Sequence, residues 1–182
     1  VAQRRWFSNL TKWRLVKRVK THTQKGMPTP EDRWRERADS NIRIVYSDGR
    51  DIAQAADIAH RADTVLLVAG YCADDEGENL TSNRQPVAKP KVPRGGDRAS
   101  LYLHKKQQQL ITTVCDANKN TVVAVIAGSA VMMNYWQDKP AAIIFAGYPG
   151  MEGGHALANI LFGDVNPSGK LPFTIPANDK QL

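Results

Sequence analysis

Runs of consecutive apolar residues recur along the chain. Three of them, DTVLLVAG (63–70), TVVAVIAG (121–128) and AAIIFAG (141–147), show no alternation with polar residues. An alternating strand has one face in water, whereas an unbroken apolar run is typical of a strand buried on both faces. A further run, NIRIVY (41–46), also predicts a strand. These patterns predict a sheet whose strands are covered on both sides.

Segments with a helical spacing of apolar residues lie between these runs. They predict helices over 51–62, 104–118 and 150–163, and a shorter helix over 30–38. The expected buried faces include Ile52, Ala55, Ala56 and Ala59 of the first helix and Ala156, Ile160 and Leu161 of the third. KLPFTI (170–175) predicts a last, edge strand, because its proline cannot donate a ladder hydrogen bond. The alternation predicts an α/β fold, a three-layer sandwich with a mostly parallel central sheet flanked by helices.

Composition fits one soluble globular domain. The chain has 182 residues, of which 42% are hydrophobic and 24% charged. No apolar run approaches the roughly 18 residues of a membrane span, and no signal peptide opens the sequence. The first residue is Val, which suggests a fragment or a processed product. Two cysteines, Cys72 and Cys115, are too few for a disulfide framework and lack metal-ligand spacing, and Cys115 is expected in the core.

Positive charge is concentrated at the N-terminus. Residues 1–26 carry eight Lys or Arg and no acid, while the formal net charge of the whole chain is +7. Such a segment could bind nucleic acid or an anionic membrane, or could be a solvated extension. We favour the extension and consider nucleic acid an unlikely partner, because no nucleic-acid motif accompanies the charge. Residues 1–28 are therefore assigned to a basic extension or linker, which could be disordered, and residues 29–182 to one domain.

Four carboxylates, those of Asp74, Asp75, Glu76 and Glu78, follow the apolar run 63–70. Parallel α/β sheets bind ligands beyond the carboxyl ends of their strands, so this loop is well placed for chemistry. A carboxyl group beside other carboxylates has a raised pKa, as a proton donor near neutral pH requires. The alternatives are a solvated acidic loop and a calcium site, although the spacing is not that of an EF-hand.

Other motifs are weaker. GDVNPSGKL (163–171) follows a helix and lacks the spacing of a phosphate-binding P-loop, so we interpret it as a structural turn. Ser129 has no GxSxG context. The glycines at 153 and 154 are expected to allow close packing of a helix on the sheet. Four histidines, His22, His60, His104 and His155, show no ligand spacing, so neither a metal nor another cofactor is predicted.

Several longer motifs follow one another in a characteristic order: GDRASLYL, NTVVAVIAGSAVMM and AAIIFAGYPGMEGGHALANILFGDVNPSGKLPFTIP. Together they resemble the C-terminal α/β-sandwich domain of glycoside hydrolase family 3, from about Thr29 to Pro176. In that family an N-terminal barrel supplies an Asp nucleophile, and a loop of the sandwich domain supplies a Glu as general acid/base. The loop that corresponds here is the one with the four carboxylates.

The resemblance implies roles for individual residues. Glu76 best matches the family's acid/base, and Glu78 is the alternative. Asp97 and Arg98 resemble a family pair that we interpret as anchors of the loop. Tyr135 and Trp136 could line a sugar site or belong to the core. The implied reaction is retaining hydrolysis of a β-glycoside, with β-glucosides the commonest substrates of such relatives, and without a cofactor.

The sequence also departs from the family. The barrel is absent, and we find neither the family's opening strand nor any family match in residues 1–26. The chain alone is therefore expected to be inactive or nearly so, because its partners in catalysis are the barrel domain and the β-glycoside or oligosaccharide substrate. A non-catalytic carbohydrate-binding or interaction module remains the alternative. NLT sequences at Asn9 and Asn79 could carry glycans, and the family makes a periplasmic or secreted location plausible, but the compartment stays unknown.

Overall fold

The computed structural model describes residues 12–17, 42–72, 75, 98 and 100–181. The helix predicted over 30–38 lies outside these residues. The elements in chain order are β1 (Lys12–Lys17), β2 (Arg43–Ser47), α3 (Ile52–His60), β3 (Thr64–Gly70), α5 (Lys105–Ala117), β4 (Thr121–Ile126), β5 (Ala142–Phe145), α6 (Gly153–Leu161) and a short 3-10 helix, η1 (Asp179–Gln181). The helices predicted over 51–62, 104–118 and 150–163 are confirmed, each slightly shorter at its ends.

The five strands form one sheet in the order β2-β1-β3-β4-β5. Every neighbouring pair is parallel, as the sequence predicted for most of the sheet. One strand was not foreseen: the expectation that residues 1–26 contain no strand is wrong for β1, which pairs with both β2 and β3. Part of the basic segment is therefore a central strand, and its place is fixed by two neighbours far along the chain.

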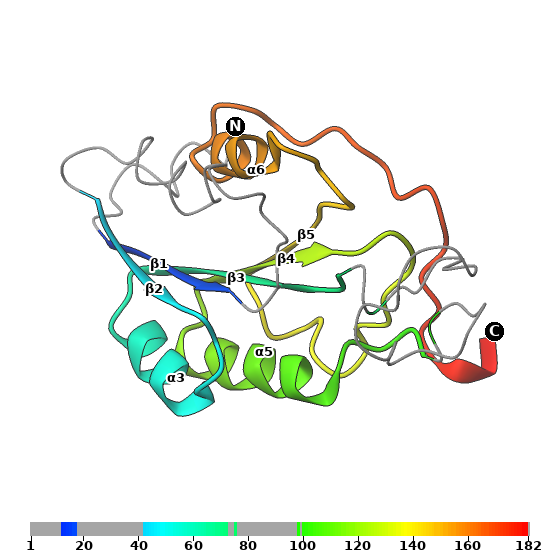
Figure 1. Ribbon diagram of the computed structural model, residues 1–182, viewed down its shortest axis with the longest axis horizontal. Helices are drawn as coiled ribbons and strands as arrows, with labels where there is room; N and C mark the ends of the chain where they lie inside the picture. The colour runs from blue at the N-terminus through cyan, green and yellow to red at the C-terminus, as the bar shows by residue number, and fades with distance from the viewer. Residues whose placement is uncertain (1–11, 18–41, 73–74, 76–97, 99, 182) are drawn as a thin grey trace, which may run out of the picture.

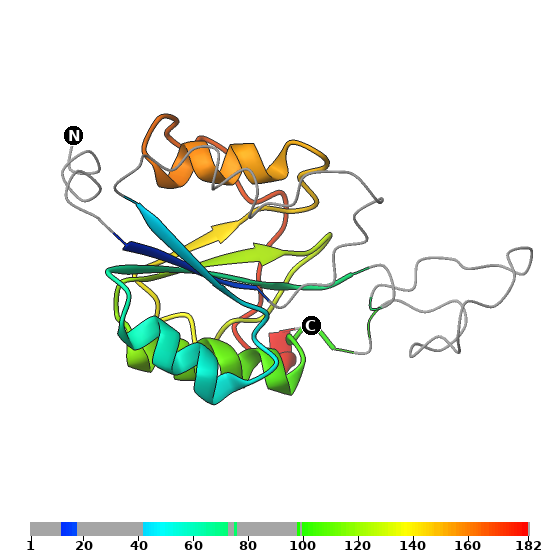
Figure 2. The ribbon, with the colours of Figure 1, turned by 60° about the vertical axis from the view of Figure 1, so that its left-hand side comes forward.

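Helices cover both faces of the sheet, which confirms the three-layer sandwich. Helices α3 and α5 lie side by side on one face, and α6 lies on the other (Figures 1 and 2). Successive residues of a strand point to opposite faces. In β3, Leu67 and Ala69 pack toward α3 and α5, whereas Leu66 and Val68 pack toward α6. The unbroken apolar run of β3 thus serves two cores at once.

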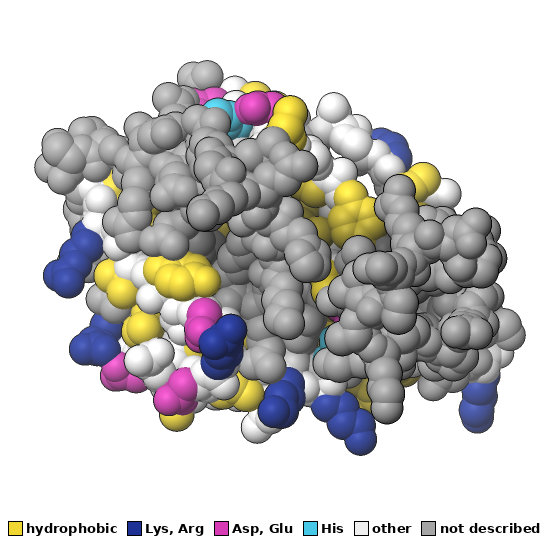
Figure 3. All heavy atoms as spheres, in the orientation of Figure 1, with side chains coloured by type: hydrophobic (Ala, Val, Ile, Leu, Met, Phe, Trp, Pro, Cys, Tyr) yellow, Lys and Arg dark blue, Asp and Glu magenta, His cyan; other side chains and the backbone are white. Residues whose placement is uncertain are grey.

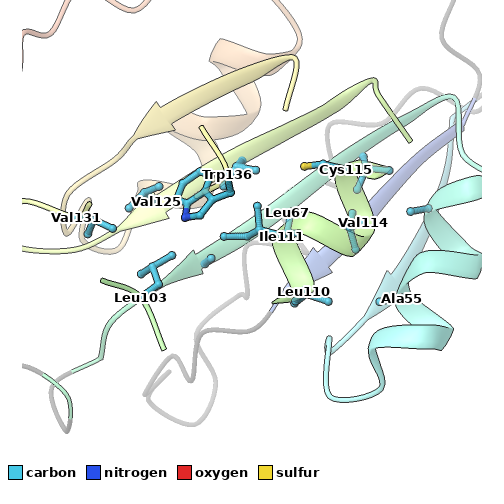
Figure 4. Close-up of a cluster of buried hydrophobic side chains, with 14 of the residues drawn as sticks. Ala55, Leu67, Leu103, Leu110, Ile111, Val114, Cys115, Val125, Val131 and Trp136 are labelled. Atoms are coloured by element: carbon cyan, nitrogen blue, oxygen red, sulfur yellow. The ribbon is translucent and has the colours of Figure 1, made fainter. Parts of the chain in front are cut away.

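The larger core lies between the sheet and α5 (Figure 4). Helix α5 turns one apolar face into it, formed by Leu110, Ile111, Val114 and Cys115, all with no exposed surface. Burying a side chain of this size contributes about 1.5–3 kcal/mol relative to leaving it in water. Helix α3 adds the small side chains of Ala55 and Ala59, which let it pack closely, while Ala56 is only half-buried. Its start is fixed by Asp51, whose side chain accepts a 3.0 Å hydrogen bond from the Gln54 N–H.

Three details of the sequence prediction are wrong. Strand β5, expected to be buried on both faces, is partly exposed because it is the edge strand and pairs only with β4 among the described strands. The strand expected over 170–175 is an irregular segment, in which Pro172 has no N–H to donate. In α6 the buried face contains Leu157, Ala158 and Leu161, so Ala156 points to solvent instead.

Within the described part of the chain, no helix combines the length and apolar character needed to cross a bilayer. On the face seen in Figure 3, the described Lys and Arg side chains lie mostly toward the outline of the molecule, and acidic side chains lie beside some of them.

Candidate active-site edge

The candidate site is built on the carboxyl end of β3, where the backbone makes an unusual approach. Gly70, the last residue of β3, has φ +154° and pairs with Ile126 of β4. A Cβ atom at this position would lie 1.9 Å from the Ile126 carbonyl oxygen. Only glycine fits so close to a neighbouring backbone, so the strand can end here and turn into the loop.

A buried glutamine from α5 holds the same strand end. The Gly70 N–H donates to Gln107 Oε1 at 3.1 Å, and Gln107 Nε2 donates to the Gly70 carbonyl at 2.8 Å. The described pairing of β1 with β3 extends to Lys17 and Val68. At Gly70, the side-chain amide of Gln107 satisfies both peptide groups.

The next residue, Tyr71, is buried and links three segments. Its hydroxyl donates to the Tyr102 carbonyl, and the Arg98 guanidinium lies 4.2 Å from the centre of its ring. Arg98 also donates to the Ser129 hydroxyl and, at 2.9 Å, to the Ala130 carbonyl. Arg98 thus connects the end of β3 with the loop that follows β4. These contacts are what we expected of an anchoring residue, whereas its neighbour Asp97 lies outside the described residues.

Asp75 forms the polar centre of this edge. Its Oδ2 accepts a hydrogen bond from the Cys72 N–H at 3.0 Å and lies 3.2 Å from Cys72 Sγ, while Oδ1 lies 2.8 Å from His104 Nε2. Burial alone would raise the pKa of Asp75, but the hydrogen bonds from Cys72 and His104 outweigh it and hold the pKa below its usual value. Asp75 is therefore ionised near neutral pH. Of the clustered carboxylates, this one does not have the raised pKa of a proton donor.

The residues predicted to carry the chemistry, Glu76 and Glu78, lie outside the described residues, as does Asp74. Their roles stay predictions. The sequence analysis missed His104, which gave no signal because its partner is 29 positions away. Among the residues that the structure describes, no three His, Cys, Asp or Glu side chains form a group that could hold a metal ion.

The two aromatic candidates have different environments. Trp136 is 1% exposed and belongs to the core against α5, whereas Tyr135 is 64% exposed. The Tyr135 ring packs on Tyr102, with 5.2 Å between the ring centres and 32° between the ring planes. Of these two residues, Tyr135 is therefore the one whose ring is accessible from solvent.

Gly153, the first residue of α6, allows close packing, but not the packing on the sheet that was expected. A Cβ atom on Gly153 would lie 2.4 Å from Pro149 Cγ. Gly153 therefore lets the helix begin against the preceding loop rather than against the sheet.

The described fold and the polar edge define a class: a parallel α/β domain whose candidate ligand surface lies beyond the carboxyl ends of its central strands. The sequence model described as "Glycosyl hydrolase family 3 C-terminal domain" matches residues 9–182. The chain belongs to this family. Because the match begins before β1, the expectation that the basic segment matches nothing in the family is wrong.

Individual relatives agree with this placement. A β-glucosidase of Schizophyllum commune is 35% identical over 151 residues, covering 81% of this chain and 73% of the relative. A xylan 1,4-β-xylosidase of Xylanibacter ruminicola is 37% identical over 118 residues, covering 65% of this chain and 13% of the relative. The crystal structure of a family 3 β-glucosidase from Bifidobacterium adolescentis matches with a TM-score of 0.71 and 27% identity, covering 93% of this chain and 25% of that one. The chain thus spans only a small part of the last two proteins.

Proposed function

We propose that this chain is the C-terminal domain part of a retaining β-glycosidase, with β-glucosidase as the favoured activity. The observation that carries the proposal is the family match over residues 9–182, together with relatives named β-glucosidase and β-xylosidase. In this proposal Glu76 is the general acid/base, with Glu78 as the alternative. A barrel domain supplies the Asp nucleophile.

The described geometry supports a catalytic role for the loop after β3. The segment 76–97 is flanked by Asp75 and Arg98, and both of these residues are tied by hydrogen bonds to other elements of the sheet edge. Catalysis requires that a proton donor be held in position, and fixed flanking residues favour this. An ionised Asp75 next to Glu76 in the sequence would also raise the pKa of that carboxyl, because two negative charges repel.

The proposed reaction has two steps. The barrel Asp attacks the anomeric carbon while Glu76 donates its proton to the departing glycosidic oxygen, and a covalent glycosyl-enzyme forms. Glu76, now a carboxylate, then removes a proton from the water that releases the sugar. In retaining enzymes the two carboxyl groups lie roughly 5–5.5 Å apart across the bond. The chain alone lacks the nucleophile in this scheme, so we expect it to be inactive without the barrel.

The deciding experiment compares Glu76→Gln with Glu78→Gln in an enzyme that contains this chain behind a barrel domain. Two substrates are used, dinitrophenyl β-glucoside and methyl β-glucoside. The first has a leaving group that departs without protonation, whereas the second needs a general acid. Loss of the true acid should lower kcat/KM for the methyl glucoside by about 10²–10⁴-fold. The same change should affect the dinitrophenyl glucoside far less.

A second readout identifies the base role. Azide added to Glu76→Ala should restore turnover and give a β-glucosyl azide, because azide attacks the glycosyl-enzyme without needing a base. If only the Glu78 variants show the dependence on the leaving group and the rescue by azide, Glu78 is the general acid/base instead of Glu76. If neither glutamate shows the dependence on the leaving group, the loop is not catalytic and the proposal fails in favour of a carbohydrate-binding or interaction module.

A further inference from the structure

His104 is the residue at which helix α5 begins, but its side chain does not cap that helix. An N-cap side chain ordinarily accepts a hydrogen bond from a backbone N–H of the first turn, and His104 makes no such bond. Its Nε2 atom lies 2.8 Å from Asp75 Oδ1 instead. Because an ionised carboxylate can only accept hydrogen bonds, the His104 Nε2–H donates to Asp75. The side chain therefore serves the segment after β3 rather than its own helix.

The start of α5 breaks a second local rule. Its first two residues, Lys105 and Lys106, are cations, and its first turn contains no acid. Cations are unfavourable at the positive end of a helix dipole. The Asp75 carboxylate brings the missing negative charge to this end of α5 through its contact with His104. Departures from local rules concentrate at functional sites, so this contact is a candidate for more than stability.

Asp75 is held from two sides. Its Oδ1 accepts from His104, and its Oδ2 accepts from the Cys72 N–H at 3.0 Å. The Asp75 N–H also donates to the Cys72 carbonyl at 2.9 Å. The Asp75 side chain is only 17% exposed, whereas that of His104 is 57% exposed. Asp75 is therefore bonded to the residues that follow β3 through Cys72, and to α5 through His104.

His104 is itself firmly held. Its carbonyl accepts from the N–H groups of Gln107 and Gln108, at 2.8 and 3.1 Å. Its ring packs edge to face against the buried Tyr71, with 5.9 Å between the ring centres. A donor that is already fixed loses little freedom when it bonds to Asp75, so the entropic cost of this contact is small.

We propose that His104 is a positioning residue, which anchors Asp75 to α5 and thereby fixes the start of the proposed catalytic loop. This inference rests on the proposed function. Glu76 is joined to Asp75 by one peptide bond, across which Cα atoms lie about 3.8 Å apart, so an anchored Asp75 restricts the backbone of Glu76. Asp75 also precedes Glu78 by only three residues, so the same anchor serves either candidate acid. A displacement of about 1 Å at a reacting group can lower a rate about 10²-fold.

The first test uses the barrel-containing enzyme with methyl β-glucoside and dinitrophenyl β-glucoside. His104→Ala should lower kcat for the methyl glucoside about 10–100-fold with KM nearly unchanged, and should leave the dinitrophenyl glucoside nearly unaffected. A purely structural role would not depend on the leaving group. His104→Gln keeps an N–H donor at about the position of Nε2 and should restore most of the rate. His60→Ala is the matched control, because His60 is an exposed histidine that ends α3 before β3 begins.

The effect of His104 should act through Asp75. Asp75→Ala removes the acceptor, so adding His104→Ala to this variant should cause little further loss on the methyl glucoside. Losses that multiply in the double variant would show that His104 acts independently of Asp75, and would overturn the proposal.

Amide hydrogen exchange in the chain alone reports the anchor without catalysis. The Cys72 N–H donates to Asp75 Oδ2, so its exchange should become faster in His104→Ala and stay near the wild-type rate in His104→Gln and His60→Ala. An unchanged rate in His104→Ala would overturn the proposal.

The two sets of variants separate this inference from the proposed function. If Glu76→Gln shows the dependence on the leaving group but His104→Ala behaves like the wild type, or loses equally on both glucosides, this inference alone fails. If variants of both Glu76 and Glu78 lack that dependence, the proposed function fails. The positioning role then falls with it, even where the exchange of the Cys72 amide shows that the anchor exists.

Discussion

Replacing Gln107 with leucine should destabilise the fold by removing the support of the β3 end. The substitution keeps the side-chain size, so the main loss is the pair of hydrogen bonds to Gly70, at 3.1 and 2.8 Å. Each buried peptide group that loses its partner costs about 1–3 kcal/mol. The apolar leucine offsets part of this, because the site is buried. We expect a net loss of about 2–4 kcal/mol in the free energy of unfolding.

Urea unfolding followed by circular dichroism measures this loss, and amide hydrogen exchange shows where it arises. The Gly70 amide should exchange much faster in Gln107→Leu, whereas the amides in the middle of β3 should keep most of their protection relative to global unfolding. The matched control is Gln109→Leu, the same chemical change on the exposed side of α5, which should alter stability by no more than about 0.5 kcal/mol. Equal effects at the two positions would refute the reasoning that the Gln107 amide supports the peptide groups of Gly70.

Two further predictions concern titrating groups. Asp75 has a lowered pKa in the folded chain, so its contribution to stability is complete above its unfolded pKa of about 4 and is lost as pH falls through the folded value. The difference in the free energy of unfolding between wild type and Asp75→Asn, measured by urea unfolding, should therefore shrink steadily below pH ~4. A difference that does not change with pH would contradict this. Burial, with a smaller effect of the nearby Asp116 charge, raises the pKa of Cys115 to about 11, whereas Cys72 is only half-buried. A thiol reagent at mildly alkaline pH should therefore label Cys72 in the native chain and both cysteines after denaturation, and rapid labelling of Cys115 in the native chain would show that the core opens.

Local sequence patterns were sufficient for most of the sheet and its helices. The unbroken runs of β3 and β4 predicted strands correctly because burial on both faces leaves a signal that does not depend on neighbours. Strand β1 was missed because its residues lie in a strongly basic segment, and its strand conformation depends on pairing with β2 and β3. The exposure of β5 was also unpredictable from its own residues, since it depends on the strand's position at the sheet edge.

For the candidate site, the sequence predicted the location but few of the side-chain contacts. The sequence located the edge, because carboxylates after a buried strand in an α/β pattern point to the carboxyl end of a sheet. It did not reveal which side chains meet there. Gln107 lies 37 positions from Gly70, and Arg98 lies 31 positions from Ser129. Such pairs form because the chain returns to the same edge of the sheet. A single sequence has no local pattern that reveals which of its distant residues will meet.

The central position of β1 has a consequence for handling the protein. Strand β1 lies between β2 and β3, so a shortened chain that lacks residues 12–17 would split the sheet. Both β2 and β3 would then present rows of peptide groups without a strand partner on that side. Exposed strand edges recruit strands from other molecules, which leads to aggregation. Trimming the basic N-terminal segment to improve solubility would therefore have the opposite effect once it reached Lys12.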